Sequence, residues 1–291
     1  MTLRQLNHIE AREAFHTLLL QRLRDTLPKG TWRLKGGVNL RLFFGSVRYS
    51  EDMDFDANSR ARDALKREMR KILKDRPFLA RLARLGIRDV RQEGRAIHKD
   101  TETTLRFKMQ LVVQGGISLP TKLETSFRPG CTDDIEIEEP ADPAVVGRYL
   151  EPAELPLLVP HYPLLPTVRQ KLAALALRNQ VQARDVFDLF AITKGSTTGV
   201  DLPLLRKNLA DATLLEARTR ALDLPYEAYE GKVLEFLDET VRQAWANRWV
   251  EQQIFVADLA EEIMKLPGGL EEPTPDATAY PDDQAAGGTV E

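Results

Sequence analysis

The sequence predicts an α/β N-terminal lobe built around a short mixed sheet, followed by an all-helical C-terminal lobe. Apolar and polar residues alternate over several short stretches before residue 127, which is typical of half-buried strands. From Thr167 onward the apolar residues recur at helical spacing. A proline-rich connection at 140–166 separates the two patterns, and 291 residues are enough for two packed lobes. We therefore expect one domain at 1–145 and a second at 146–265.

The N-terminal lobe begins with alternating helical and extended stretches. Residues 5–26 carry apolar side chains at helical spacing, and the sequence PKG at 28–30 ends this helix. The stretch TWRL predicts a strand and VNLRLFF one or two turns of helix. SEDMDFDA at 50–57 alternates with a period of two and predicts a second strand. Residues 60–85 are basic and amphipathic, so we expect a helix there.

Three further strands are predicted at 87–93, 103–113 and 119–127. Strict alternation of apolar and polar residues makes the second of these the clearest. In the third, Lys122 and Glu124 would share one face. The N-terminal lobe should therefore contain a sheet that joins these strands to the two earlier ones.

The C-terminal lobe shows helical spacing throughout. We expect helices at 167–179, 182–194, 201–211, 213–222, 226–247 and 251–265. The last residues, 266–291, are rich in Pro, Gly and Ala and hold six acidic residues and no basic one. Such a segment cannot bury enough apolar surface to fold, so we expect a disordered acidic tail.

Charge and composition narrow the functional classes. The net charge is −3, and without the six acidic residues of the tail residues 1–265 carry +3, which permits a nucleic-acid partner without requiring one. No apolar run approaches the roughly 20 residues that span a bilayer. The N-terminus lacks the apolar core of a signal peptide, so a cytoplasmic location is the default expectation. The single Cys131 excludes an internal disulfide.

The stretch SEDMDFDA places Asp52, Asp54 and Asp56 at every second position. On a strand these carboxylates would line one face, with Met53 and Phe55 entering the core. Carboxylates crowded on one face repel one another, and Mg²⁺ bound by them and by substrate phosphates would compensate. A solvated acidic edge strand explains the same pattern, so the strand alone leaves both interpretations open.

A calcium-binding EF-hand loop also begins with three acidic residues at alternate positions. Ala57 stands where such a loop needs glycine, and Asp63 stands where it needs glutamate. We therefore set calcium aside.

Gly36 and Gly37 lie between the predicted strand TWRL and the helix that follows. Backbone N–H groups of a glycine pair can approach an anion closely, and a helix N-terminus adds a favourable dipole. Arg48 and Ser50, just before the acids, could hold phosphate oxygens. A plain turn, a surface charge and a strand-start cap explain these residues equally. Their order along the chain would place a phosphate cradle beside a metal site.

The helix at 167–179 carries Lys171 and, seven residues later, Arg178. These two cations share one helix face and could grip a triphosphate, although a solvated basic face has the same pattern. Asp185 and Asp188 are three residues apart and could pair with them. A structural salt-bridge network that holds the two lobes together is therefore an alternative for this block.

Two blocks of the sequence resemble a known family. KGGVNLRLFFGSVRYSEDMDF is similar to the first motif of the AbiEii/AbiGii-type nucleotidyltransferase toxins of type IV toxin–antitoxin systems. That family includes the mycobacterial MenT toxins and belongs to the DNA polymerase β-like nucleotidyltransferase superfamily. TVRQKLAALALRNQVQARDVFDLFAI resembles the later motif of the family, and the resemblance covers about residues 10–195. It implies that the α/β lobe is a nucleotidyltransferase lobe.

The resemblance also implies roles for individual residues. Two Mg²⁺ ions would be held by Asp52, Asp54 and Glu124, and the family pattern expects the last of these on a later, adjacent strand. Asp56 falls outside the pattern and is expected to be structural. The expected catalytic residues are Asp52, Asp54, Glu124, Lys171 and Asp185. The expected phosphate-binding residues are Gly36, Gly37, Arg48, Ser50, Lys171 and Arg178.

The implied activity is transfer of a nucleoside monophosphate from an NTP to the 3′ end of tRNA. This would block aminoacylation and stop translation, and an antitoxin encoded alongside would be the partner. The basic stretch at 60–76 could follow an RNA backbone, or it could be a solvated helix face. A nucleotidyl- or phosphotransferase acting on a protein, and a non-catalytic nucleotide-binding module, are the alternatives.

Overall fold

The computed structural model describes residues 6–92, 97–127, 137–194 and 199–268 of the chain. The chain forms two compact units. Unit 1 comprises Met1–Pro163 and the short segment Phe236–Asp238, and unit 2 comprises Leu164–Glu235 and Glu239–Glu291. Cys131 and all but the first residues of the predicted acidic tail lie outside the described residues.

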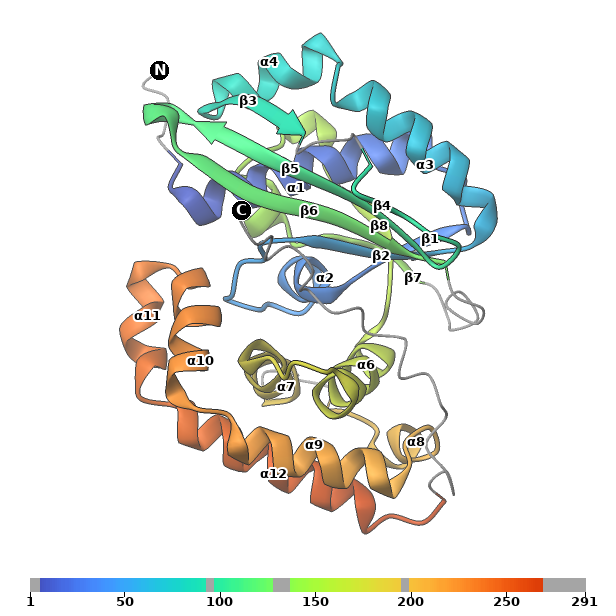
Figure 1. Cartoon of the computed structure of the whole chain (residues 1–291), viewed down its shortest axis with the longest axis vertical. Helices are drawn as coiled ribbons and strands as arrows, with labels where there is room; N and C mark the ends of the chain where they lie inside the picture. The colour runs from blue at the N-terminus through green and yellow to red at the C-terminus, as the bar shows by residue number, and fades with distance from the viewer. Residues whose placement is uncertain (1–5, 93–96, 128–136, 195–198, 269–291) are drawn as a thin grey trace, which may run out of the picture. The chain divides into compact units, whose positions relative to one another are not determined.

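Unit 1 is built on one mixed sheet, which confirms the predicted fold class (Figure 1). In the described part of the chain the sheet has eight strands: β1 (Trp32–Lys35), β2 (Met53–Ala57), β3 (Ile87–Gln92), β4 (Lys99–Asp100), β5 (Thr104–Val113), β6 (Ser118–Ser126), β7 (Ile137–Pro140) and β8 (Leu158–His161). The strand order is β3-β5-β6-β2-β1-β8-β7, and β4 pairs with β5. β2 runs parallel to β6 and antiparallel to β1, so the acidic strand lies between these two.

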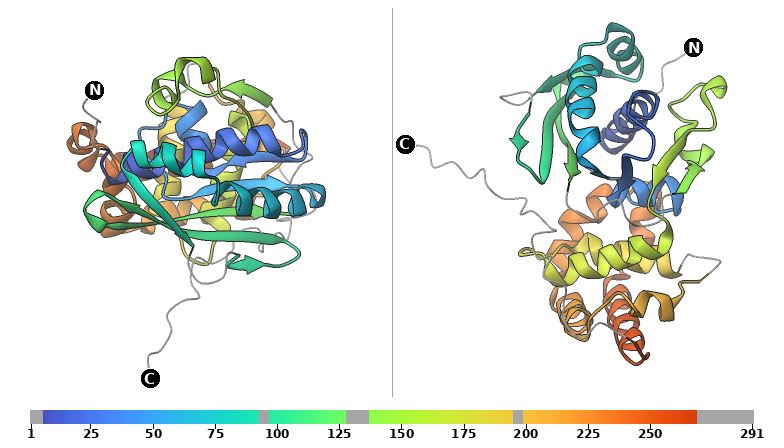
Figure 2. Two further views of the ribbon diagram at one scale, coloured as in Figure 1. Left: turned by 90° about the horizontal axis from the view of Figure 1, so that it is seen from above. Right: turned by 90° about the vertical axis from the view of Figure 1, so that its right-hand side faces the viewer.

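The two faces of this sheet differ in chemistry. Helices α1 (His8–Thr26), α3 (Ser59–Ile72) and α4 (Arg76–Arg84) lie on one face, and α2 (Gly36–Phe43) lies on the other (Figures 1 and 2). Met53 and Phe55 belong to the core beneath α1 and α3, and each is at most 1% exposed. Because side chains alternate along a strand, Asp54 points to the opposite face. That face is the one on which a binding site can form.

The predicted helix at 60–85 consists of two helices, α3 and α4. Asp75 accepts a hydrogen bond from the backbone N–H of Phe78 and caps α4, whose first turn contains Pro77. An aspartate followed by a proline at the start of a helix is a start signal, and the chain therefore begins a new helix here. The amphipathic pattern continues across this junction, which is why it predicts one long helix.

The sequence predicts a proline-rich connection at 140–166. This segment contains α5 (Pro143–Val146) and β8, which pairs in parallel with β1. The prolines at 160 and 163 conceal this strand in the sequence, because proline cannot donate a hydrogen bond to a neighbouring strand. Unit 1 runs to Pro163, whereas the expected domain boundary after residue 145 stays a prediction.

Unit 2 is helical throughout its described residues, as the spacing predicts. Its helices are α6 (Leu164–Leu177), α7 (Ala183–Lys194), α8 (Leu202–Arg206), α9 (Asp211–Asp223), α10 (Tyr226–Lys232), α11 (Glu239–Ala246) and α12 (Trp249–Met264). The predicted helix at 226–247 is interrupted at Phe236–Asp238, a segment that belongs to unit 1, in which the carbonyl of Phe236 accepts a hydrogen bond from the backbone N–H of Tyr49. Of the helices in the described ranges, none combines the length and apolar character that crossing a membrane requires.

Candidate functional site

The glycine pair lies where β1 ends and α2 begins. Gly36 adopts a φ of 72°, which favours glycine, and a Cβ atom here would stand 2.7 Å from Oδ2 of Asp54. A Cβ atom on Gly37 would stand 2.7 Å from Oγ of Ser50 and 3.0 Å from Nη2 of Arg48. A side chain at either position would therefore collide with these groups, and glycine at both positions lets the backbone lie close to them. Five of the sequence-predicted site residues meet at this point of unit 1.

Arg48 and Ser50 shape the backbone that leads into the acidic strand. Arg48 is 4% exposed, and its Nη1 donates a 3.0 Å hydrogen bond to the carbonyl of Tyr49. Ser50 Oγ donates a 2.8 Å hydrogen bond to the carbonyl of Asp52. Both side chains thus have structural contacts in the ligand-free chain. Their phosphate-binding role stays a prediction.

The central pair of carboxylates comes from neighbouring parallel strands. Asp54 of β2 is directly opposite Glu124 of β6 in the register, so both side chains stand on the same face of the sheet. Among the described residues, no side chain forms a hydrogen bond or ion pair with the Asp54 carboxylate. Asp54 is partly exposed, whereas Glu124 is 8% exposed. The third predicted acid therefore adjoins the second, as the pattern required.

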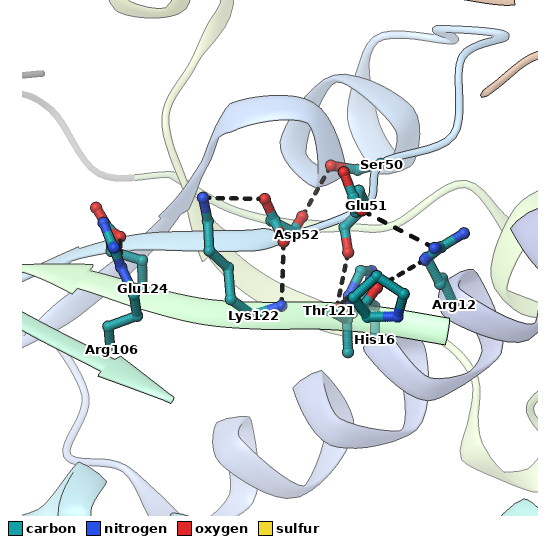
Figure 3. Close-up of polar contacts among 10 residues, drawn as sticks. Arg12, His16, Ser50, Glu51, Asp52, Arg106, Thr121, Lys122 and Glu124 are labelled. Carbon is teal, nitrogen blue, oxygen red and sulfur yellow. Dashed lines mark hydrogen bonds and ion pairs between the residues drawn. The ribbon is translucent and has the colours of Figure 1, made fainter. Parts of the chain in front are cut away.

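Two basic side chains neutralise the other two predicted acids (Figure 3). Nζ of Lys122 lies 3.2 Å from Oδ2 of Asp52, and the backbone N–H of Lys122 donates to Oδ1 of the same carboxylate at 3.0 Å. Nε of Arg106 donates to Oε2 of Glu124 at 2.5 Å. The predicted strand at 50–57 includes Asp52, but the observed β2 begins at Met53, so Asp52 lies one residue before the strand.

Mg²⁺ fits this donor set in its chemistry. Carboxylate oxygens are its preferred ligands, and Gly36 keeps a side chain away from the Asp54 carboxylate. In the ranges that the structure describes, no three acidic, histidine or cysteine side chains converge as a metal site requires. The reason is that Asp52 and Glu124 are directed at Lys122 and Arg106. Asp52, Asp54 and Glu124 would hold the ion once those ion pairs open.

Asp56 has contacts of a different kind. It is 5% exposed and accepts hydrogen bonds from Nζ of Lys35 at 2.5 Å and from the hydroxyl of Tyr162 at 2.7 Å. These contacts join β2 to β1 and to the chain just beyond β8. A buried carboxylate that is satisfied in this way serves the fold. The geometry agrees with the expectation that Asp56 is structural.

Buried hydrogen bonds connect α1, through β6, to the segment that carries Asp52. Nε2 of His16 in α1 lies 2.8 Å from Oγ1 of Thr121, and Thr121 donates its hydroxyl proton to the carbonyl of Glu51 at 2.7 Å. His16 must therefore donate through Nε2. Burial, and then the nearby charge of Arg12, lower the pKa of His16 to about 3, so the ring is neutral at physiological pH.

The second predicted block forms a buried charge cluster in unit 2. Nζ of Lys171 donates to Oδ1 of Asp185 at 2.8 Å and to Oδ2 of Asp188 at 2.6 Å. Nη1 of Arg178 donates to Oδ2 of Asp185 at 2.8 Å. Both aspartates are fully buried, and Lys171 is 8% exposed. Two cations and two carboxylates thus compensate one another in a salt-bridge network whose four residues all belong to unit 2.

Asp185 makes the stability of the chain depend on pH. Burial alone would raise the pKa of this carboxyl, but the charges of Arg178 and Lys171 outweigh burial and hold the pKa well below its usual range. A carboxyl with a depressed pKa in the folded chain stabilises it above the unfolded pKa of about 4 and loses this contribution as the pH falls below it. We expect the melting temperature of the wild type to drop below about pH 4 more steeply than that of Asp185→Asn. Thermal melts over this range check the slope, and parallel curves for the two proteins would contradict it.

Comparison with known proteins decides the family. The sequence model of the family described as nucleotidyl transferase AbiEii toxin, type IV toxin–antitoxin system, matches residues 18–266. This span includes both blocks of predicted site residues. The chain belongs to the AbiEii family. The resemblance drawn from the two sequence motifs is therefore confirmed.

Solved structures share the fold of this AbiEii-family chain. JHP933 from Helicobacter pylori is 20% identical, with a TM-score of 0.51, over 90% of this chain and 94% of its own. MenT4, a nucleotidyltransferase toxin from Mycobacterium tuberculosis, is 18% identical, with a TM-score of 0.51, over 89% of this chain and 90% of its own. No curated protein is similar enough in sequence to count as a relative. At these identities the likeness establishes the fold.

Sequence reasoning missed several residues of the AbiEii-family site. The sequence places Lys122 on one strand face with Glu124, but it does not identify Lys122 and Arg106 as the ion-pair partners of Asp52 and Glu124. The alternation of side chains along the two strands could have indicated these partners, because Lys122 and Arg106 both lie on the face that carries Glu124. His16 gave no signal, because its contact with Thr121 is set by helix packing.

Proposed function

We propose that this AbiEii-family chain is a Mg²⁺-dependent nucleotidyltransferase that moves a nucleoside monophosphate from an NTP to an acceptor hydroxyl. The observation that carries the proposal is the register of Asp54 with Glu124, beside a glycine pair that leaves space at the Asp54 carboxylate. Carboxylates from adjacent strands next to backbone N–H groups suit the binding of a metal–triphosphate complex.

The proposed reaction exchanges one phosphate ester bond for another. The acceptor oxygen bonds to the α-phosphorus, the bond from that phosphorus to the oxygen bridging to the β-phosphate breaks, and pyrophosphate leaves as the hydroxyl proton is lost. Asp52, Asp54 and Glu124 would hold Mg²⁺, which when bound supplies positive charge at the phosphate and acidifies the hydroxyl. The backbone at Gly36 and Gly37 would bind the outer phosphates.

The family resemblance gives Lys171 and Arg178 a role toward the substrate phosphates. Lys171 has three N–H donors, of which Asp185 and Asp188 take two, so one remains for a phosphate oxygen. Asp185 also binds Arg178 and would thereby hold both cations in a fixed orientation. We propose that Lys171 and Arg178 neutralise charge that develops on pyrophosphate.

We propose the 3′ end of tRNA as the acceptor and an antitoxin as the protein partner. The family description, a toxin of a type IV toxin–antitoxin system, supports the antitoxin. The basic helix α3 packs on the face of the sheet opposite Asp54, so its exposed cations do not line the carboxylate face. Lys108 and Lys122, paired across β5 and β6, are among the cations that share that face with Glu124. They are better placed to meet an acceptor phosphate.

Labelling of tRNA tests this proposal. Purified protein with Mg²⁺ and each of the four NTPs should add label to the 3′ end of tRNA. Asp52→Ala should abolish the labelling and leave the circular dichroism spectrum unchanged, because Asp52 lies at the sheet surface and is not part of the core. Full labelling of tRNA by Asp52→Ala would contradict the proposed role of Asp52. Label on a protein, with none on tRNA, would show that the acceptor is a protein.

A further inference from the structure

We infer that His16 of α1 is a positioning residue for nucleotidyl transfer, acting through Thr121 on the segment that carries Asp52. This inference rests on the proposed function and adds a residue that neither the sequence motifs nor the metal-ligand pattern includes. Its basis is a chain of two hydrogen bonds, His16 to Thr121 and Thr121 to the carbonyl of Glu51, which is the residue before Asp52 (Figure 3).

The direction of each bond in this chain is fixed. A threonine hydroxyl has one proton, and Thr121 donates it to Glu51, so the lone pair of Thr121 must accept from the imidazole. His16 is 3% exposed and Thr121 is 3% exposed, so water does not compete for either bond. Buried hydrogen bonds of this kind hold their partners in one geometry.

The segment before β2 is fixed at three consecutive residues. Ser50 donates to the carbonyl of Asp52, Thr121 donates to the carbonyl of Glu51, and the backbone N–H of Lys122 donates to the carboxylate of Asp52. Two of these three donors are neighbours on β6. The position of Thr121 therefore determines where both the backbone and the carboxylate of Asp52 stand.

Helix α1 fixes this part of β6 from behind the sheet. Thr121 and Lys122 are successive residues of a strand, so their side chains point to opposite faces, and His16 contacts the one that faces α1. Nε of Arg12, one turn earlier in α1, donates to the carbonyl of Pro120 at 2.9 Å. Two side chains of α1 thus bind the strand at adjacent residues. Nη2 of Arg12 also lies 3.9 Å from Oε1 of Glu51, whereas His16 reaches the backbone carbonyl of Glu51 through the hydroxyl of Thr121.

Removal of the His16 donor should therefore slow the reaction more than it unfolds the protein. Loss of outer contacts to metal-binding residues typically costs 10- to 100-fold in affinity or activity. We expect His16→Leu to lower kcat by about 10- to 100-fold, with the KM for the NTP within about threefold of wild type. Thr121→Val should have the same effect, and Thr121→Ser and His16→Gln should restore most of the activity because each keeps its donor group.

A double-mutant cycle separates positioning from a general loss of stability. His16→Leu with Thr121→Val should be no slower than the worse single variant, because both break one chain. Ala14→Gly, in the same helix and fully buried, serves as a control that weakens α1 without touching Thr121. At matched melting temperature it should keep near wild-type kcat. Hydrogen exchange at residues 50–52 should be faster in His16→Leu than in Ala14→Gly.

The outcomes distinguish this inference from the proposed function. Wild-type protein without transferase activity would overturn both. If the wild type is active, single effects that multiply in the double variant would overturn the inference alone. The same holds if His16→Leu is no slower than Ala14→Gly.

Discussion

Asp54→Asn is expected to lower nucleotidyl transfer by at least about 10³-fold, the equivalent of roughly 4 kcal/mol of transition-state stabilisation. The substitution keeps the size of the side chain and removes the charge that we propose binds Mg²⁺. No described side chain bonds to this carboxylate, and Glu124 stands directly opposite it, so its neutralisation removes a repulsion within the fold. We therefore expect an unchanged or slightly higher melting temperature. Single-turnover labelling with protein in excess measures the loss.

Asp56→Asn provides the matched control, two residues away on the same strand and the same face. Here the carboxylate accepts from Lys35 and from Tyr162 in a buried position. Weakening these bonds should lower the free energy of unfolding by about 1–3 kcal/mol. Activity of the folded fraction should stay within about tenfold of wild type, since the residue acts on the fold alone. An inactive but fully stable Asp56→Asn would show that we have assigned the two aspartates the wrong way round.

Lys171→Met is expected to lower the free energy of unfolding by about 3–5 kcal/mol, because it leaves two fully buried carboxylates short of a cation. Urea unfolding followed by circular dichroism measures the change. Lys194→Met is the control, since Lys194 pairs with Glu251 at the surface and its loss should alter stability little. A Lys171→Met protein as stable as wild type would contradict the cluster as described.

A second substitution separates the structural role of Lys171 from its proposed phosphate-binding role. In Lys171→Met with Asp188→Asn one carboxylate is neutralised, and Asp185 keeps its bond to Arg178. Stability should recover in part. Activity should not, because the cation proposed to bind the phosphate is still missing. Should activity return together with stability, Lys171 would be a structural residue and the phosphate-binding proposal would fail.

The parts of the fold that the sequence predicts are those with a strong local period. β5 and β6 lie within a residue or so of their expected bounds because apolar and polar residues alternate along them. The adjacency of Asp54 and Glu124 also follows from sequence, because the alternation fixes which side chains share a face and the family pattern demands adjacent strands. Local alternation is therefore enough to predict these strands and the face on which each side chain lies.

The remainder depends on contacts between residues far apart in the chain. β8 is a short strand interrupted by proline, and its pairing with β1 depends on the rest of the sheet. The ion pair of Lys122 with Asp52 and the hydrogen bond of Tyr162 to Asp56 depend on strand register, which no local pattern specifies. His16 reaches Thr121 only because α1 packs across β6. Such partners become visible once the sheet is assembled.

The central claim is that the acidic face formed by Asp54 and Glu124 transfers a nucleotide. The most direct measurement compares NTP labelled at the α-phosphate with NTP labelled at the γ-phosphate, using tRNA as acceptor and the wild type beside Asp54→Asn. We expect α-label to appear on the 3′ end and γ-label to be released as pyrophosphate, and we expect neither with Asp54→Asn. Transfer of γ-label to the acceptor, or undiminished α-transfer by Asp54→Asn, would contradict it.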